Sequence, residues 1–86
     1  MLFFVMSDPY FANNKEVAPT RKKFKEWIDD LKSQKKVIQT YHKMGKGSIV
    51  LFDVASNDEL HKLMMQWLDI VCIPVKFEVI PLVTQK

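Results

Sequence analysis

The sequence predicts an α+β domain in which strands and helices follow one another in the order βαββαβ. Two segments repeat apolar residues at the three- and four-residue steps of an amphipathic helix, and four shorter segments are apolar or alternate in the manner of strands. Gly45 and Gly47 mark a tight turn between two of these strands. With 86 residues, 48% hydrophobic and 27% charged, the chain has the size and composition of one folded domain, residues 1–86.

A short strand and a long helix are expected first. Residues 2–6 are all apolar and are followed by Ser-Asp-Pro, which suits a strand buried on both faces and closed by a turn. From residue 17 to residue 31, apolar side chains recur at helical spacing. Proline is tolerated in the first turn of a helix, so Pro19 predicts that the helix begins near Glu16 or Val17.

A hairpin is expected next. Residues 37–44 mix polar and apolar side chains in the manner of an edge strand, and residues 48–54 form a more apolar strand beyond the glycine turn. Strict alternation places the odd-numbered side chains from Val37 to Lys43 on one face of the sheet and the even-numbered ones on the other.

A second helix and a last strand complete the predicted domain. Residues 56–59, Ser-Asn-Asp-Glu, form a capping box in which the Ser56 side chain accepts the Glu59 backbone N–H. Apolar residues at helical spacing continue to Leu68, and residues 75–83 alternate as a half-exposed strand.

Right-handed crossovers place the first and third strands in the centre of an antiparallel sheet and the second and fourth at its edges. The predicted central strands are apolar on both faces, whereas the predicted edges carry the polar side chains. Two helices cover only one face of this ferredoxin-like, four-stranded sheet, so we expect a second copy of the chain to cover the apolar other face. The alternative is that this face is a platform for a ligand or RNA.

The charge is uneven, because 10 of the 13 Lys and Arg residues lie in residues 1–46. The cluster between Arg21 and Lys36 attracts small anions or nucleic acid, but acidic residues interrupt it and we interpret most of it as a solvated helix face. Residues 49–52 lack the aromatic pattern of an RNA-binding sheet, so no nucleic-acid partner is expected.

The only cysteine, Cys72, excludes an intrachain disulfide and is expected to be a small core residue. No apolar run is long enough to span a membrane, so we expect a cytoplasmic protein without a membrane partner. No metal-binding motif is present, and neither a metal nor another cofactor is expected.

No nucleotide-binding motif or catalytic triad can be identified, so the candidate catalytic residues are His42 and Tyr41 on the predicted edge strand. Because imidazole titrates near neutrality, His42 suits a proton-transfer role. Neighbouring strand residues point to opposite faces, so Tyr41 and His42 are not expected to act in one pocket of the same subunit. The other histidine, His61, is expected to face solvent.

The chain resembles the muconolactone isomerases over nearly its whole length. Residues 52–61, Phe-Asp-Val-Ala-Ser-Asn-Asp-Glu-Leu-His, are similar to the F-D-V-x-S-N-D-E-L-H segment of that family. The opening, with Met1-Leu2-Phe3, Val5 and Asp8, and the last strand, with Phe77-Glu78-Val79 and Leu82, are also similar.

The resemblance implies a dimeric α/β barrel that assembles as a homodimer or a larger homo-oligomer. It also implies a cofactor-free reaction of aromatic-compound catabolism in which proton transfer moves a double bond within a carboxylated lactone. Arg21 and Lys25 retain the basic character of the family's first helix and are implied to bind the substrate carboxylate, whereas Pro19 and Phe24 stand where the family has acidic residues. On the second strand, His42 is implied as the replacement base, with Tyr41 beside it.

The function predicted in this way is that of a muconolactone delta-isomerase-like enzyme acting on a small anionic, cyclic metabolite. Two alternatives remain. One is a cofactor-independent monooxygenase of the same barrel architecture, which consumes oxygen. The other is a non-catalytic small-ligand-binding or assembly subunit, whose pocket lacks a titratable group within reach of the ligand.

Overall fold

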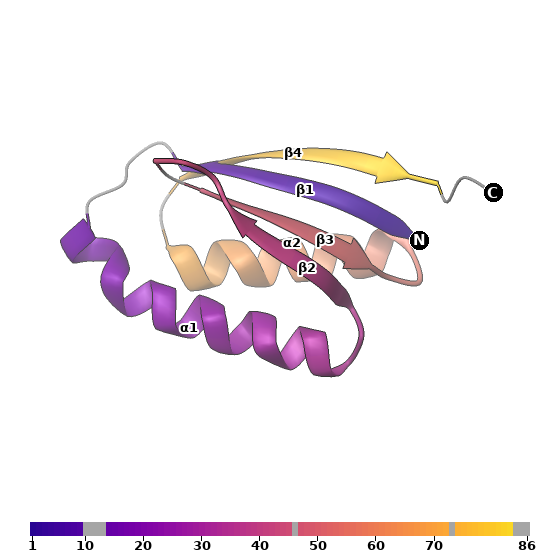
Figure 1. Ribbon diagram of the computed structural model, residues 1–86, viewed down its shortest axis with the longest axis horizontal. Coiled ribbons are helices and arrows are strands. Elements are labelled where there is room, and N and C mark those ends of the chain that lie inside the picture. The colour runs from indigo at the N-terminus through magenta and orange to yellow at the C-terminus, as the bar shows by residue number, and fades with distance from the viewer. Residues whose placement is uncertain (10–13, 46, 73, 84–86) are drawn as a thin grey trace.

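The computed structural model describes residues 1–9, 14–45, 47–72 and 74–83, with the side chains of residues 14–19 left aside. Its elements follow the predicted βαββαβ order, which confirms the α+β, ferredoxin-like class (Figure 1). They are β1 (Leu2–Pro9), α1 (Asn14–Ser33), β2 (Val37–His42), β3 (Ser48–Asp53), α2 (Asn57–Val71) and β4 (Val75–Leu82).

The four strands form one antiparallel sheet in the order β2-β3-β1-β4. The two strands with uninterrupted apolar runs, β1 and β3, are therefore central, and β2 and β4, in which polar residues interrupt the apolar ones, lie at the edges, as predicted. Both helices pack on the same side of the sheet, and no element of the described chain lies over the other side (Figure 1).

The strand register assigns each side chain to one of these two sides. Phe3 pairs with Phe52 and Val5 with Val50, and all four side chains are buried beneath the helices. The alternate pairs, such as Phe4 with Leu51, point to the uncovered side, which we call the open face. Its apolar side chains are those of Leu2, Phe4, Met6, Ile49, Leu51, Ile80 and Leu82.

Trp67 of α2 lies at the centre of the core and is only 2% exposed. Its ring centroid lies 4.9 Å from that of Phe77 on β4, 5.4 Å from Phe24 on α1 and 6.3 Å from Phe52 on β3. Tilted aromatic pairs at these separations are favourable beyond the area they bury. One side chain thereby joins both helices to the sheet.

Strand β2 contains a β-bulge that the sequence pattern did not predict. Val37 pairs with Phe52 and Gln39 with Leu51, so Ile38 is an extra residue between two successive pairs. Val37 is consequently buried in the core at 4% exposure, whereas Ile38 is 52% exposed. The expectation that Val37 shares a face with Gln39 and Tyr41 is wrong, because the bulge shifts the alternation by one residue.

Helix α1 begins at Asn14, so the predicted start near Glu16 or Val17 is also wrong. Lys15, Glu16 and Ala18 have high helix propensity and extend the helix by more than a turn before Pro19. Pro19 then lies in the second turn, where it supplies no backbone donor to the preceding turn.

The helix α1 ends in a Schellman motif. The backbone N–H of Lys36 donates to the Leu31 carbonyl over 2.9 Å, and that of Lys35 donates to the Lys32 carbonyl over 3.0 Å. Lys35 closes the motif in the left-handed conformation, with φ of 62°, although glycine is favoured at this position.

The predicted cap of α2 is present, because the Ser56 hydroxyl accepts the Glu59 backbone N–H over 3.1 Å. At the other end of α2, Cys72 takes the left-handed cap position with φ of 56°. Its thiol is exposed and lies 2.9 Å from the Asp69 carbonyl oxygen. The expectation that Cys72 is a core residue is therefore wrong, since a residue that caps the helix here faces solvent.

The turn after β2 packs tightly on the end of β1. Ser7 is 4% exposed, and its hydroxyl accepts the Ser48 backbone N–H over 2.8 Å and donates to the Ser48 carbonyl over 3.1 Å. The Ser7 hydroxyl thus makes the two hydrogen bonds to the Ser48 backbone by which one more residue pair would extend the β1–β3 ladder beyond Met6 and Ile49. Gly47, with φ of +91°, lies so close that a Cβ on it would clash with the Ser7 carbonyl oxygen.

We expect Gly47→Ala to lower the free energy of unfolding by about 2–4 kcal/mol, because the substitution adds a steric clash to an unfavourable φ. Gly45→Ala is the matched control: its φ is +94°, but a Cβ there meets nothing within 4 Å. The control should lose only about 1 kcal/mol. Urea unfolding monitored by tryptophan fluorescence measures both, and equal losses would contradict the close approach at Gly47.

We expect Lys35→Gly to raise the free energy of unfolding by about 0.5–1 kcal/mol, because glycine adopts the left-handed conformation without steric cost. The same change at Lys32, inside the last helical turn, should lower it by about the same amount. Thermal unfolding of the two variants gives the comparison, and a loss of stability in Lys35→Gly would refute this account of the helix end.

Candidate functional site

A groove of about 860 Å³ lies between α1 and β2, and we call it the α1–β2 groove. This volume is within the usual range of small-molecule sites. The groove brings together all four residues that the sequence analysis selected, namely Arg21, Lys25, Tyr41 and His42.

One wall of the groove is a face of α1. Arg21, Lys25, Ile28 and Lys32 are separated by steps of four, three and four residues, so the helical period places them in one stripe along the helix. Asp29 supplies the carboxylate of this wall. Three basic side chains against one acidic side chain give the wall a positive potential that favours anions.

The opposite wall is the helix-facing side of β2. Thr40 pairs with Val50 and His42 with Ser48, so their side chains lie on the same side of the sheet as the core. Tyr41 pairs with Ile49 and therefore directs its ring to the open face, although it also borders the groove. Of the two candidate proton-transfer residues, the register thus directs His42 toward the basic wall and Tyr41 away from it.

The floor of the groove is apolar. Phe24 and Ile28 of α1 meet Trp67 of α2 beneath the basic rim. The turn after β2, with Gly45 and Gly47, closes one end. A cationic rim above an aromatic and aliphatic floor is suited to a small molecule that carries both a ring and an anionic group.

Helix α1 and β2 run in opposite directions beside the groove (Figure 1). The end of β2 that carries His42 therefore lies toward the part of α1 that carries Arg21, in its first half, and Lys25, just past its midpoint. Lys32 lies toward the other end, near the start of β2. The groove accordingly has one end with an imidazole and two cations, and another end with one cation.

Most of the other lining residues were not among the predicted site residues, and three of them bear on what the groove can bind. Lys32 could have been found from the helical period, since it lies seven residues after Lys25, and Thr40 from its position two residues before His42 on the same strand. Trp67 belongs to a different helix, and no local sequence signal connects it with the groove.

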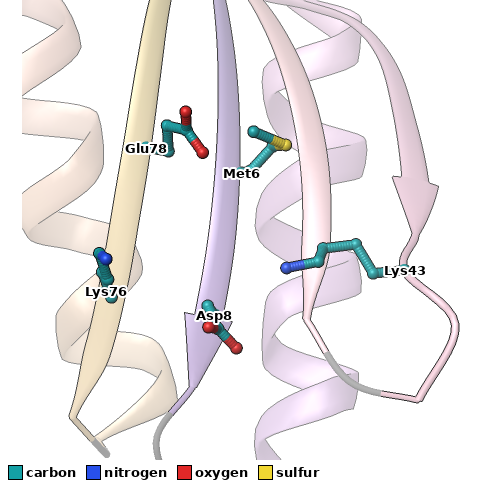
Figure 2. A pocket seen from close by; sticks show the side chains of 5 residues that line it. All are labelled: Met6, Asp8, Lys43, Lys76 and Glu78. Atoms are coloured by element: carbon teal, nitrogen blue, oxygen red, sulfur yellow. The ribbon is translucent and has the colours of Figure 1, made fainter.

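A second, smaller hollow of about 120 Å³ lies on the open face, near the end of β1 (Figure 2). Met6, two acidic residues (Asp8 and Glu78) and two basic residues (Lys43 and Lys76) line it. Lys43 extends from the end of β2 across β3, and its Nζ donates to the Ser7 carbonyl over 3.2 Å (Figure 2). The hollow has two positive and two negative side chains and a small volume, so it is a poor match for an organic substrate.

Within the described ranges, no three His, Cys, Asp or Glu side chains are grouped closely enough to hold a metal ion. Neither helix of the described chain combines the length and the apolar character that crossing a membrane requires. His61 is exposed on α2, away from the groove.

A search of curated proteins finds no significant match to this chain. The resemblance to the muconolactone isomerases therefore stays a prediction. A family model described as "Domain of unknown function (DUF3303)" matches residues 1–86, which is the full length of the chain. On that match, the chain belongs to the DUF3303 family.

Proposed function

We propose that the α1–β2 groove binds a small carboxylated cyclic metabolite and that the protein moves a double bond in it by proton transfer, as muconolactone isomerases do. The observation that carries the proposal is that His42 lies across one groove from Arg21 and Lys25. An imidazole facing a pair of cations is the minimum needed to hold a carboxylate and to move a proton beside it.

In the proposed reaction, Arg21 and Lys25 hold the substrate carboxylate at the end of the groove nearest His42. The neutral imidazole of His42 takes a proton from the saturated ring carbon just beyond the double bond that is conjugated with the lactone carbonyl. The electron pair of the broken C–H bond then spreads over the conjugated system as a dienolate. The imidazolium returns the proton at the carbon next to the carbonyl, which leaves the double bond in its new position and restores neutral His42.

The apolar floor supports this reaction in two ways. Phe24, Ile28 and Trp67 provide a surface for the ring of the substrate. They also exclude water on one side, which strengthens the electrostatic interaction between the two cations and the developing negative charge. The reaction as proposed needs neither a metal nor an organic cofactor.

We expect His42→Ala to reduce kcat by about 100-fold or more in an ultraviolet assay with muconolactone, because it removes the only base in the proposed reaction. His61→Ala, an exposed histidine on α2, is the matched control and should retain full activity. Full activity in His42→Ala would exclude His42 as the base.

Two other measurements on the unmodified protein would overturn the proposal in favour of an alternative. Oxygen consumption with an aromatic substrate indicates the monooxygenase alternative. Binding of the lactone without turnover by the unmodified protein indicates a ligand-binding subunit.

We further propose that a second copy of the chain covers the open face, so that the protein is a homodimer or larger homo-oligomer. Seven apolar side chains from three strands share this face, and the hollow at its end adds two positive and two negative groups. A two-fold interface brings a surface against itself, and a neutral patch with both signs of charge satisfies that requirement without net repulsion.

We expect Leu51→Lys to convert the assembly into single chains, because it places a charge at the centre of the open face, where Leu51 pairs with Phe4. Met65→Lys is the control, since Met65 is an exposed apolar residue on α2, on the opposite side of the sheet. Sedimentation equilibrium gives the masses, and circular dichroism shows that both variants are folded. A single-chain mass for the unmodified protein would overturn the proposed assembly.

A further inference from the structure

We propose that the α1–β2 groove takes an elongated organic dianion, with one anionic group at Arg21 and Lys25 and a second at Lys32. The inference rests on the proposed function only in using the same groove, and it assigns Lys32 a role in determining ligand specificity. A lactone with a single carboxylate occupies one end of the groove and places no anionic group at Lys32.

The spacing of the cations carries the inference. A helix rises 1.5 Å per residue, so Arg21 and Lys25 lie about 6 Å apart along α1, whereas Lys25 and Lys32 lie about 10 Å apart. Both intervals fall on the stripe that lines the groove. The first interval suits two cations sharing one anionic group, and the second suits two separate anionic groups.

The side chains of α1 between Lys25 and Lys32 indicate what the middle of the ligand is made of. Ile28 is buried there and contributes an apolar surface, together with half-buried Phe24. Asp29 adds a negative charge on the same wall. A chain of closely spaced phosphates would be repelled by this carboxylate, so the wall favours two terminal anionic groups joined by an uncharged segment over nucleic acid.

The size of the groove and its opposite wall agree with a long ligand. The volume of about 860 Å³ is at the upper end of the usual range for small-molecule sites. Because β2 runs opposite to α1, Thr40 lies nearer to the Lys32 end than His42 does, and its hydroxyl can donate a hydrogen bond to the second anionic group.

Isothermal titration calorimetry at low ionic strength tests the inference with two matched probes, octanedioate and octanoate, which differ in one terminal carboxylate. We expect the unmodified protein to bind octanedioate about two- to fivefold more tightly, which is what one exposed ion pair supplies. Lys32→Gln should abolish this preference and leave the affinity for octanoate unchanged. Lys23→Gln, which removes a charge from the opposite side of α1, should keep it.

The second group need not be a carboxylate, so octyl phosphate is a third probe that carries a dianion at one end only. If it matches octanedioate in affinity and is insensitive to Lys32→Gln, the groove responds to total charge and the second subsite is refuted. Equal affinity for octanedioate and octanoate in the unmodified protein also refutes it.

The failure of this inference can be distinguished from the failure of the proposed function. If octanedioate and octanoate bind with equal affinity and Arg21→Gln weakens the binding of both probes, the first anion site at Arg21 and Lys25 stands. Only the second subsite, at Lys32, is then refuted. If neither probe binds, the groove is not an anion site, and this inference falls together with the proposed substrate-binding role of Arg21 and Lys25.

Discussion

The packing of Trp67 against aromatic side chains from three other elements is the interaction on which the rest of the structure depends. Its ring meets Phe24 of α1, Phe52 of β3 and Phe77 of β4, so it fixes the distance of both helices from the sheet. The neighbouring Trp27 indole donates to the Gln66 side chain over 2.8 Å and joins the two helices a second time. Among the described side chains of α1, residues 20–33, the two that are buried are Ile28 and Leu31, in the second half of the helix.

The groove follows from that attachment. Where α1 packs closely, the space beneath it is filled by the core, and Phe24 and Ile28 at the border of the core become the floor of the groove. Polar side chains on the same helical stripe then project above the floor. The helix therefore provides both the hydrophobic contact that holds it and the charged wall of the site, and a change in its packing also alters the geometry of the site.

Much of the fold could be predicted from the sequence because local pattern and global position agree. The uninterrupted apolar runs of β1 and β3 identify the central strands, and the polar content of β2 and β4 identifies the edges. The bulge at Ile38 could not be predicted in this way, because it appears only when β2 is aligned with β3. The early start of α1 and the exposed position of Cys72 depended on propensity and on cap geometry, which apolar periodicity does not describe.

The candidate site divides in the same way. Helical spacing is sufficient to align Arg21 and Lys25, and strand alternation is sufficient to separate His42 from Tyr41. That the stripe on α1 and the alternate residues of β2 form the two sides of one groove depends on tertiary packing, as does the contribution of Trp67. Periodicity predicts which residues share a face of a helix or strand. Only the packed structure shows which other elements lie against that face.

The bulge at Ile38 also affects how the protein avoids aggregation. An edge strand presents unpaired backbone groups that invite a strand of another molecule, and a bulge interrupts the regular repeat that such pairing needs. At the opposite edge, Pro81 in β4 removes a backbone donor. Because both edges are interrupted, continuous strand addition into fibres is disfavoured, and the open face of the sheet, rather than its edges, is the surface left for specific contact.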